Sequence, residues 1–114
     1  MKDPRLSDAA KKFIADSENT ILVSAATAWE IAIKHQTGKL VLPDAPDVYV
    51  PSRIDANRFW ELDITVAHAL HIQHLPLIHR DPFDRILIAQ SIVEDVPILT
   101  ADPMIARYGV AVVW

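Results

Sequence analysis

The sequence of 114 residues contains no cysteine and only two glycines, Gly38 and Gly109. The absence of cysteine excludes disulfide bonds and thiolate metal sites, and it fits a cytoplasmic protein. With so few glycines the chain has no glycine-rich loop to cradle a phosphate, which excludes P-loop and dinucleotide-binding folds. Its apolar runs are too short to span a bilayer, so we expect no membrane segment.

The chain also lacks an excess of basic residues. Lys and Arg total 11 against 15 Asp and Glu, which gives a formal net charge of −4. This balance excludes binding to nucleic acid through a broad basic surface. It does not exclude a nuclease, because bound cations can supply positive charge at an acidic site. The hydrophobic content of 51% suits a single domain over residues 1–114, with a sheet buried on both faces or apolar surface covered by a partner.

Short apolar runs alternate with helical patterns along the chain. The runs predict strands at residues 20–24, 60–64, 97–100 and 110–114. The 3.6-residue periodicity predicts helices at 3–16, 26–37, 65–74 and about 82–95, with a looser helix at 47–58 that breaks at Pro51. Strands separated by helices predict an α/β fold with a parallel sheet and right-handed crossovers.

The strongest local signal is the stretch HRDPFDRILIAQ, residues 79–90. Asp81 is a predicted helix N-cap, and the proline after it suits the first helical position. Asp84 lies one turn further on, on the side of Leu87 and Ile88, so its carboxylate is carried toward the interior. A capping box stabilised by the helix dipole explains an acid at this place. A metal site is the alternative.

Three acids follow or precede predicted strands. Glu30 lies in the helix after strand 20–24, Asp84 lies in the helix before strand 97–100, and Asp102 follows that strand. In open α/β sheets, sites form beyond the carboxyl ends of the strands. Gathered there, the three carboxylates would repel one another unless a cation neutralised them, and Mg²⁺ or Mn²⁺ suits such a set.

Each acid alone has a local explanation. Thr27 and Glu30 have the spacing of a capping box, and Asp102 precedes a proline as an N-cap does. Ser24, at the end of a predicted strand, is likewise best explained as an N-cap. Folding does not require the acids to converge, however, so the set as a whole favours a metal site.

Three segments in order resemble the PIN-domain family, in particular the VapC-type toxin ribonucleases of bacterial toxin–antitoxin pairs. They are SAATAWEIAIK, HRDPFDRILIAQ and ILTADPMIARYGV. The resemblance covers nearly the whole chain. It implies a three-layer α/β PIN-like fold with a parallel sheet, and a Mg²⁺- or Mn²⁺-dependent endoribonuclease in which metal-activated water attacks an RNA phosphodiester.

The resemblance also implies roles for particular residues. Glu30, Asp84 and Asp102 match catalytic metal ligands of the family's acidic quartet, with Asp81 as an accessory ligand. Nearby basic residues are candidates for RNA contacts, although an ordinary charged surface explains them equally well. They are Arg85, Arg80 and Lys34. The implied partners are an RNA substrate, a cognate antitoxin protein and a second copy of the chain in a homodimer.

The chain departs from the family at its start. Family members have a strand with the motif LLDTH and a helix before a segment like DPRLS, which this chain carries at residues 3–7. We therefore expect the central strand, the first helix and the fourth acid to be missing from this single domain. Such a loss exceeds the roughly 5–15 kcal/mol that stabilises a domain, so the chain alone is expected to be unstable and weak or inactive. The alternative function is a non-catalytic module that binds an antitoxin or dimerises.

Two further patterns have structural interpretations. His68, His71 and His74 repeat every third residue, a spacing that can bind zinc. No acid accompanies them in their helix, so solvated helix histidines are the favoured interpretation. Trp29, Ile31, Ile33 and the apolar residues of the predicted helix 65–74 are expected to belong to the core and not to a binding stripe.

Overall fold

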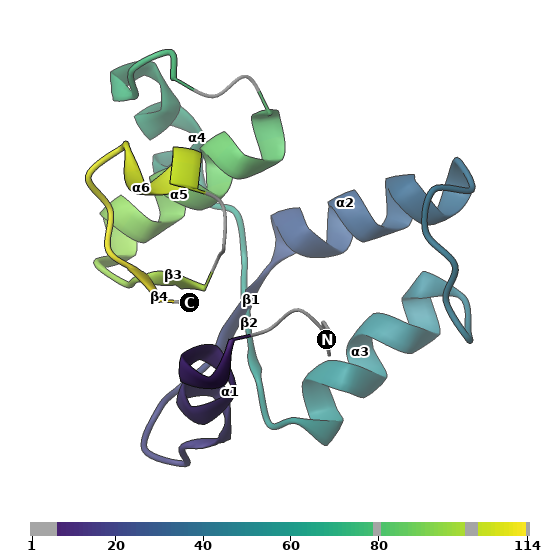
Figure 1. The fold of residues 1–114 in the computed structure, drawn as a ribbon. Helices are drawn as coiled ribbons and strands as arrows, with labels where there is room; N and C mark the ends of the chain where they lie inside the picture. Colours follow the sequence, from purple (N-terminus) through teal and green to yellow (C-terminus); the bar gives the residue numbers. More distant parts are fainter. Residues whose placement is uncertain (1–6, 79–80, 100–102, 114) are drawn as a thin grey trace. The chain divides into compact units, whose positions relative to one another are not determined.

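The computed structural model describes residues 7–78, 81–99 and 103–113 (Figure 1). The chain divides into two compact units. The first unit is Thr20–Asp63, and the second unit comprises the described residues of Lys2–Asn19 and Ile64–Trp114. In the part of the chain that is described, no helix has the length and apolar character needed to cross a membrane.

The first unit pairs two strands and two helices. Its elements are β1 (Leu22–Ser24), α2 (Ala25–Gln36), α3 (Pro46–Ala56) and β2 (Trp60–Leu62). The strands β1 and β2 are parallel, with Leu22 opposite Trp60. The helices α2 and α3 connect them, so this unit is a parallel crossover of the kind that the alternating sequence pattern predicts.

The N-terminus of α2 is fixed by Ser24. Its hydroxyl accepts a hydrogen bond from the backbone N–H of Ala26 at 3.0 Å, which confirms the predicted N-cap. The expected capping box between Thr27 and Glu30 is wrong, because the helix begins at Ala25 and Glu30 therefore lies beyond its first turn. Glu30 consequently has no capping function in this fold.

The helix α3 runs without interruption through Pro51, so the predicted break at this residue is wrong. A proline inside a helix removes one backbone hydrogen bond and is costly. Val50, Pro51 and Ile54 all line a cavity against α2, and Ile54 is buried. The helix stays whole despite this cost.

The second unit contains the remaining elements. They are α1 (Asp8–Ala15), α4 (Val66–His71), the short 3₁₀ helix η1 (Ile72–His74), α5 (Pro82–Glu94), β3 (Ile98–Leu99), α6 (Pro103–Ala106) and β4 (Val112–Val113). The strands β3 and β4 are parallel, with Ile98 opposite Val112. The core comprises Leu75, Ile88, Ala89 and Ile105. Helices combined with parallel strand pairs in both units confirm the predicted α/β class.

The interpretation of His68 as a solvated histidine is wrong, because its side chain is fully buried. Its Nδ1 accepts the backbone N–H of Thr65 at 3.0 Å, while the Thr65 hydroxyl accepts the N–H of His68 at 3.2 Å. With Nδ1 accepting, the ring proton sits on Nε2, which lies 2.8 Å from Glu94 Oε1. His68 therefore links α4 to the last turn of α5 and has no ring nitrogen left for zinc.

Candidate functional site

Asp81 and Asp84 lie at the start of α5. Asp81 Oδ1 accepts hydrogen bonds from the backbone N–H groups of Phe83 at 2.8 Å and Asp84 at 3.3 Å, which confirms the predicted N-cap. Asp84 is half-buried in the first turn, one turn before the fully buried Ile88. Both carboxylates thus occupy the end of α5 where the helix dipole favours negative charge.

The cap makes a stability prediction. Replacing Asp81 with alanine is expected to lower the free energy of unfolding by about 1 kcal/mol, because the N–H groups of Phe83 and Asp84 lose their acceptor. Replacing it with asparagine keeps an oxygen at the same place and is expected to cost far less. Urea unfolding of both variants followed by circular dichroism measures the difference, and equal losses would contradict the cap assignment.

Glu30 lies on α2 in the first unit. Its side chain is 27% exposed, and its Oε2 lies 3.3 Å from Nζ of Lys34, whose side chain is 51% exposed. The two residues are separated by one helical turn, the spacing at which a glutamate and a following lysine attract each other. The carboxylate of Glu30 is therefore half-buried and paired with the ammonium group of Lys34.

The predicted convergence of the acids stays a prediction. Glu30 belongs to the first unit and Asp84 to the second, while Asp102 and Arg80 lie outside the described residues. Among the residues that are described, no three His, Asp or Glu side chains gather in a way that could hold a metal ion. The donor type nevertheless fits, because half-buried carboxylate oxygens are the ligands that Mg²⁺ and Mn²⁺ take from proteins.

Arg85 has a clear structural role. Its Nη1 donates to the carbonyl of Pro76 at 3.0 Å and lies 3.4 Å from the hydroxyl of Tyr108, while its Nη2 donates to the carbonyl of Ile72 at 3.4 Å. The guanidinium thus holds the segment around η1 against the start of α5. An RNA contact by Arg85 stays a prediction.

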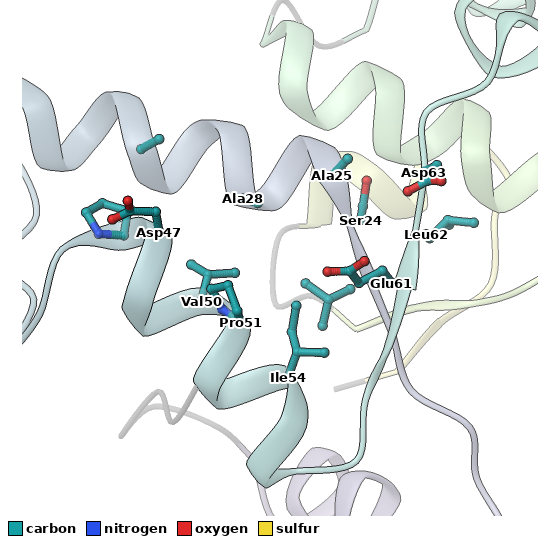
Figure 2. Close-up of a pocket in the computed structure, with 13 residues that line it drawn as sticks. Ser24, Ala25, Ala28, Asp47, Val50, Pro51, Ile54, Glu61, Leu62 and Asp63 are labelled. Carbon is teal, nitrogen blue, oxygen red and sulfur yellow. The ribbon is translucent and has the colours of Figure 1, made fainter.

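The first unit contains a cavity of about 530 Å³ that the sequence analysis did not find. Figure 2 shows Ala25 and Ala28 of α2 on one side and Val50 and Ile54 of α3 on the other. Carboxylates from Asp47, Glu61 and Asp63 also line it. The small side chains that α2 presents at helical spacing leave this space, and their spacing is the sequence signal that points to it.

Trp29 differs from its expected place. Its side chain is 58% exposed, whereas Ile31 two residues later is buried as expected. The prediction that Trp29 belongs to the core is therefore wrong. It is also wrong for Ile33, Val66 and Leu70, which are exposed. An exposed tryptophan next to Glu30 suits contact with another molecule.

Comparison with known proteins identifies the family of this chain. A family model described as the PIN domain matches residues 1–111, and the chain therefore belongs to the PIN-domain family. The chain is 39% identical over 74 residues to Ribonuclease VapC16 of Mycobacterium tuberculosis. That match covers 61% of this chain and 52% of the relative, so the chain spans about half the length of the curated relative. No solved structure matches the chain.

Proposed function

We propose that the chain belongs to a metal-dependent endoribonuclease, the toxin of a toxin–antitoxin pair, that acts in the cytoplasm. The observation that carries the proposal is the pair of half-buried acids, Glu30 on α2 and Asp84 in the first turn of α5, in a chain of the PIN-domain family. The similar protein of M. tuberculosis is named as a ribonuclease, which supports the same reaction class.

The residues have distinct roles in this proposal. Glu30, Asp84 and Asp102 hold Mg²⁺ or Mn²⁺, with Asp81 as an accessory ligand. Asp81 also holds the peptide N–H of Asp84, which orients the first turn of α5 that carries the second acid. A bound divalent ion supplies positive charge for the RNA phosphodiester and an activated water. Lys34, Arg80 and Arg85 are the proposed phosphate contacts.

A cognate antitoxin protein and a second copy of the chain are the proposed partners. Large apolar side chains on the first unit support an interface, since Trp29 is 58% exposed and Trp60 is 66% exposed. The same observation favours the second candidate function, a non-catalytic module that binds an antitoxin or dimerises.

The deciding experiment measures RNA cleavage with Mg²⁺, with Mn²⁺ and with EDTA. Cleavage is expected only with a divalent ion. The variant combining Glu30→Gln, Asp84→Asn and Asp102→Asn is the control and is expected to be inactive. Unchanged behaviour of that variant in cleavage and toxicity assays would favour the binding module.

A further inference from the structure

Glu30 and Lys34 form an ion pair on α2 that is open to water. The glutamate precedes the lysine by one turn, the favourable order on a helix, and the Nζ to Oε2 distance is 3.3 Å. The lysine side chain is 51% exposed and that of the glutamate 27%. Pairs this open to water contribute little to stability, so a stronger ligand for the carboxylate displaces the ammonium readily.

We propose that Lys34 is the counter-ion that Glu30 gives up when it binds the divalent metal, and that the released ammonium then positions an RNA phosphate. This inference rests on the proposed role of Glu30 as a metal ligand. A dication attracts the carboxylate more strongly than an exposed ammonium does, and it repels the ammonium at the same time. The flexible four-carbon stem of lysine lets the charge move to a nearby anion.

The charge pattern explains why the released lysine would meet RNA. The chain carries a formal net charge of −4, so each cation near the acids favours the approach of a phosphate. Lys34 is the only Lys or Arg on α2, the helix that carries Glu30. Lysine binds phosphate as a point charge. The Lys34 ammonium can therefore pair first with a carboxylate and then with a phosphate. Without metal, Lys34 thus pairs with Glu30. With metal bound, Lys34 is free to contact the substrate.

The first test measures the affinity for Mn²⁺ without RNA. Electron paramagnetic resonance gives the concentration of free Mn²⁺. Lys34→Met removes a competing cation beside Glu30 and is expected to tighten Mn²⁺ binding by about threefold to tenfold. Lys39→Met removes the same charge from an exposed lysine just beyond the helix and serves as the matched control, with affinity within about twofold of the parent chain. Glu30→Gln is expected to abolish binding at this site.

The second test measures RNA cleavage by the same variants, in the form of the chain that cleaves RNA. Lys34→Met is expected to raise KM by about tenfold with little change in kcat, and Lys34→Arg to restore KM because it keeps the charge. A role confined to helix stability would lower the melting temperature by about 2 °C and leave both KM and Mn²⁺ affinity unchanged. That result would overturn the exchange while the nuclease proposal stands. Undiminished Mn²⁺ binding by Glu30→Gln would overturn the metal role of Glu30 and the exchange together.

Discussion

Asp84→Asn is expected to lower kcat/KM for RNA cleavage by more than about 100-fold while leaving the fold intact. The amide has the shape of the carboxylate but no charge, so it is a poor ligand for Mg²⁺ or Mn²⁺. Mutating groups that only orient metal ligands typically lowers metal affinity or activity by about 10–100-fold. We expect the loss of a direct ligand to have a larger effect. The expected change in stability is about 1 kcal/mol, since the charge that favours the N-terminal end of α5 is lost. Steady-state cleavage kinetics and urea unfolding measure the two quantities.

Asp81→Asn provides the matched control three residues away. Asparagine is as good an N-cap as aspartate, so the hydrogen bonds to the backbone of Phe83 and Asp84 are retained. As an accessory ligand, Asp81 should matter less, and we expect a loss in kcat/KM of about tenfold. Equal losses in the two variants would mean that the N-terminus of α5 needs negative charge in general and that Asp84 is not a specific ligand.

The features that the sequence predicted correctly have both partners close together in the chain. Asp81 caps N–H groups two and three residues later, and Ser24 caps one two residues later. Such contacts depend on residue type and spacing, which the sequence displays directly. The α/β class was predictable for the same reason, since it follows from the order of apolar runs and helical patterns.

The features that the sequence could not predict depend on distant parts of the chain. His68 is fully buried, and its Nε2 lies 2.8 Å from Oε1 of Glu94, 26 residues later. No local pattern predicts that contact. Pro51 lies inside an uninterrupted α3, although proline alone predicts a break. Trp29 has the apolar character of a core residue, yet the fold leaves it 58% exposed. Helical periodicity shows that a face is apolar, and tertiary packing decides what covers it.

For the acids of the candidate site, some features follow from the local sequence and others depend on tertiary structure. Local sequence places Asp84 in the first turn of α5, and the structure agrees. Glu30 has the spacing of a capping box with Thr27, but Ser24 starts the helix earlier and removes that explanation. The half-buried carboxylate of Glu30 instead pairs with Lys34 one turn later, and its role as a metal ligand stays a prediction. Convergence with Asp102 is a statement about tertiary structure that metal-binding measurements test directly.

Replacing His68 with alanine is expected to lower the free energy of unfolding by roughly 2–4 kcal/mol. The imidazole is fully buried, so its removal leaves a cavity between α4 and α5. It also takes the acceptor from the backbone N–H of Thr65 and the donor from Glu94. Both of these residues are exposed, so most of the expected loss comes from the buried ring. Urea unfolding followed by circular dichroism measures the loss.

Glu94→Gln separates the hydrogen bond of this link from its charge. The glutamine carbonyl can still accept from Nε2 of His68, and the side chain of Glu94 is 41% exposed, so we expect a loss of about 0.5–1 kcal/mol. Thr65→Ala removes the hydroxyl that accepts the N–H of His68 and is expected to cost about 1 kcal/mol. If His68→Ala costs no more than these two milder changes, the buried ring does not hold α4 to α5. If it costs several times more, packing of the ring and the pairing of both its nitrogens stabilise the helix pair, and α5 owes its position to a residue that sequence pattern alone assigned to the solvent.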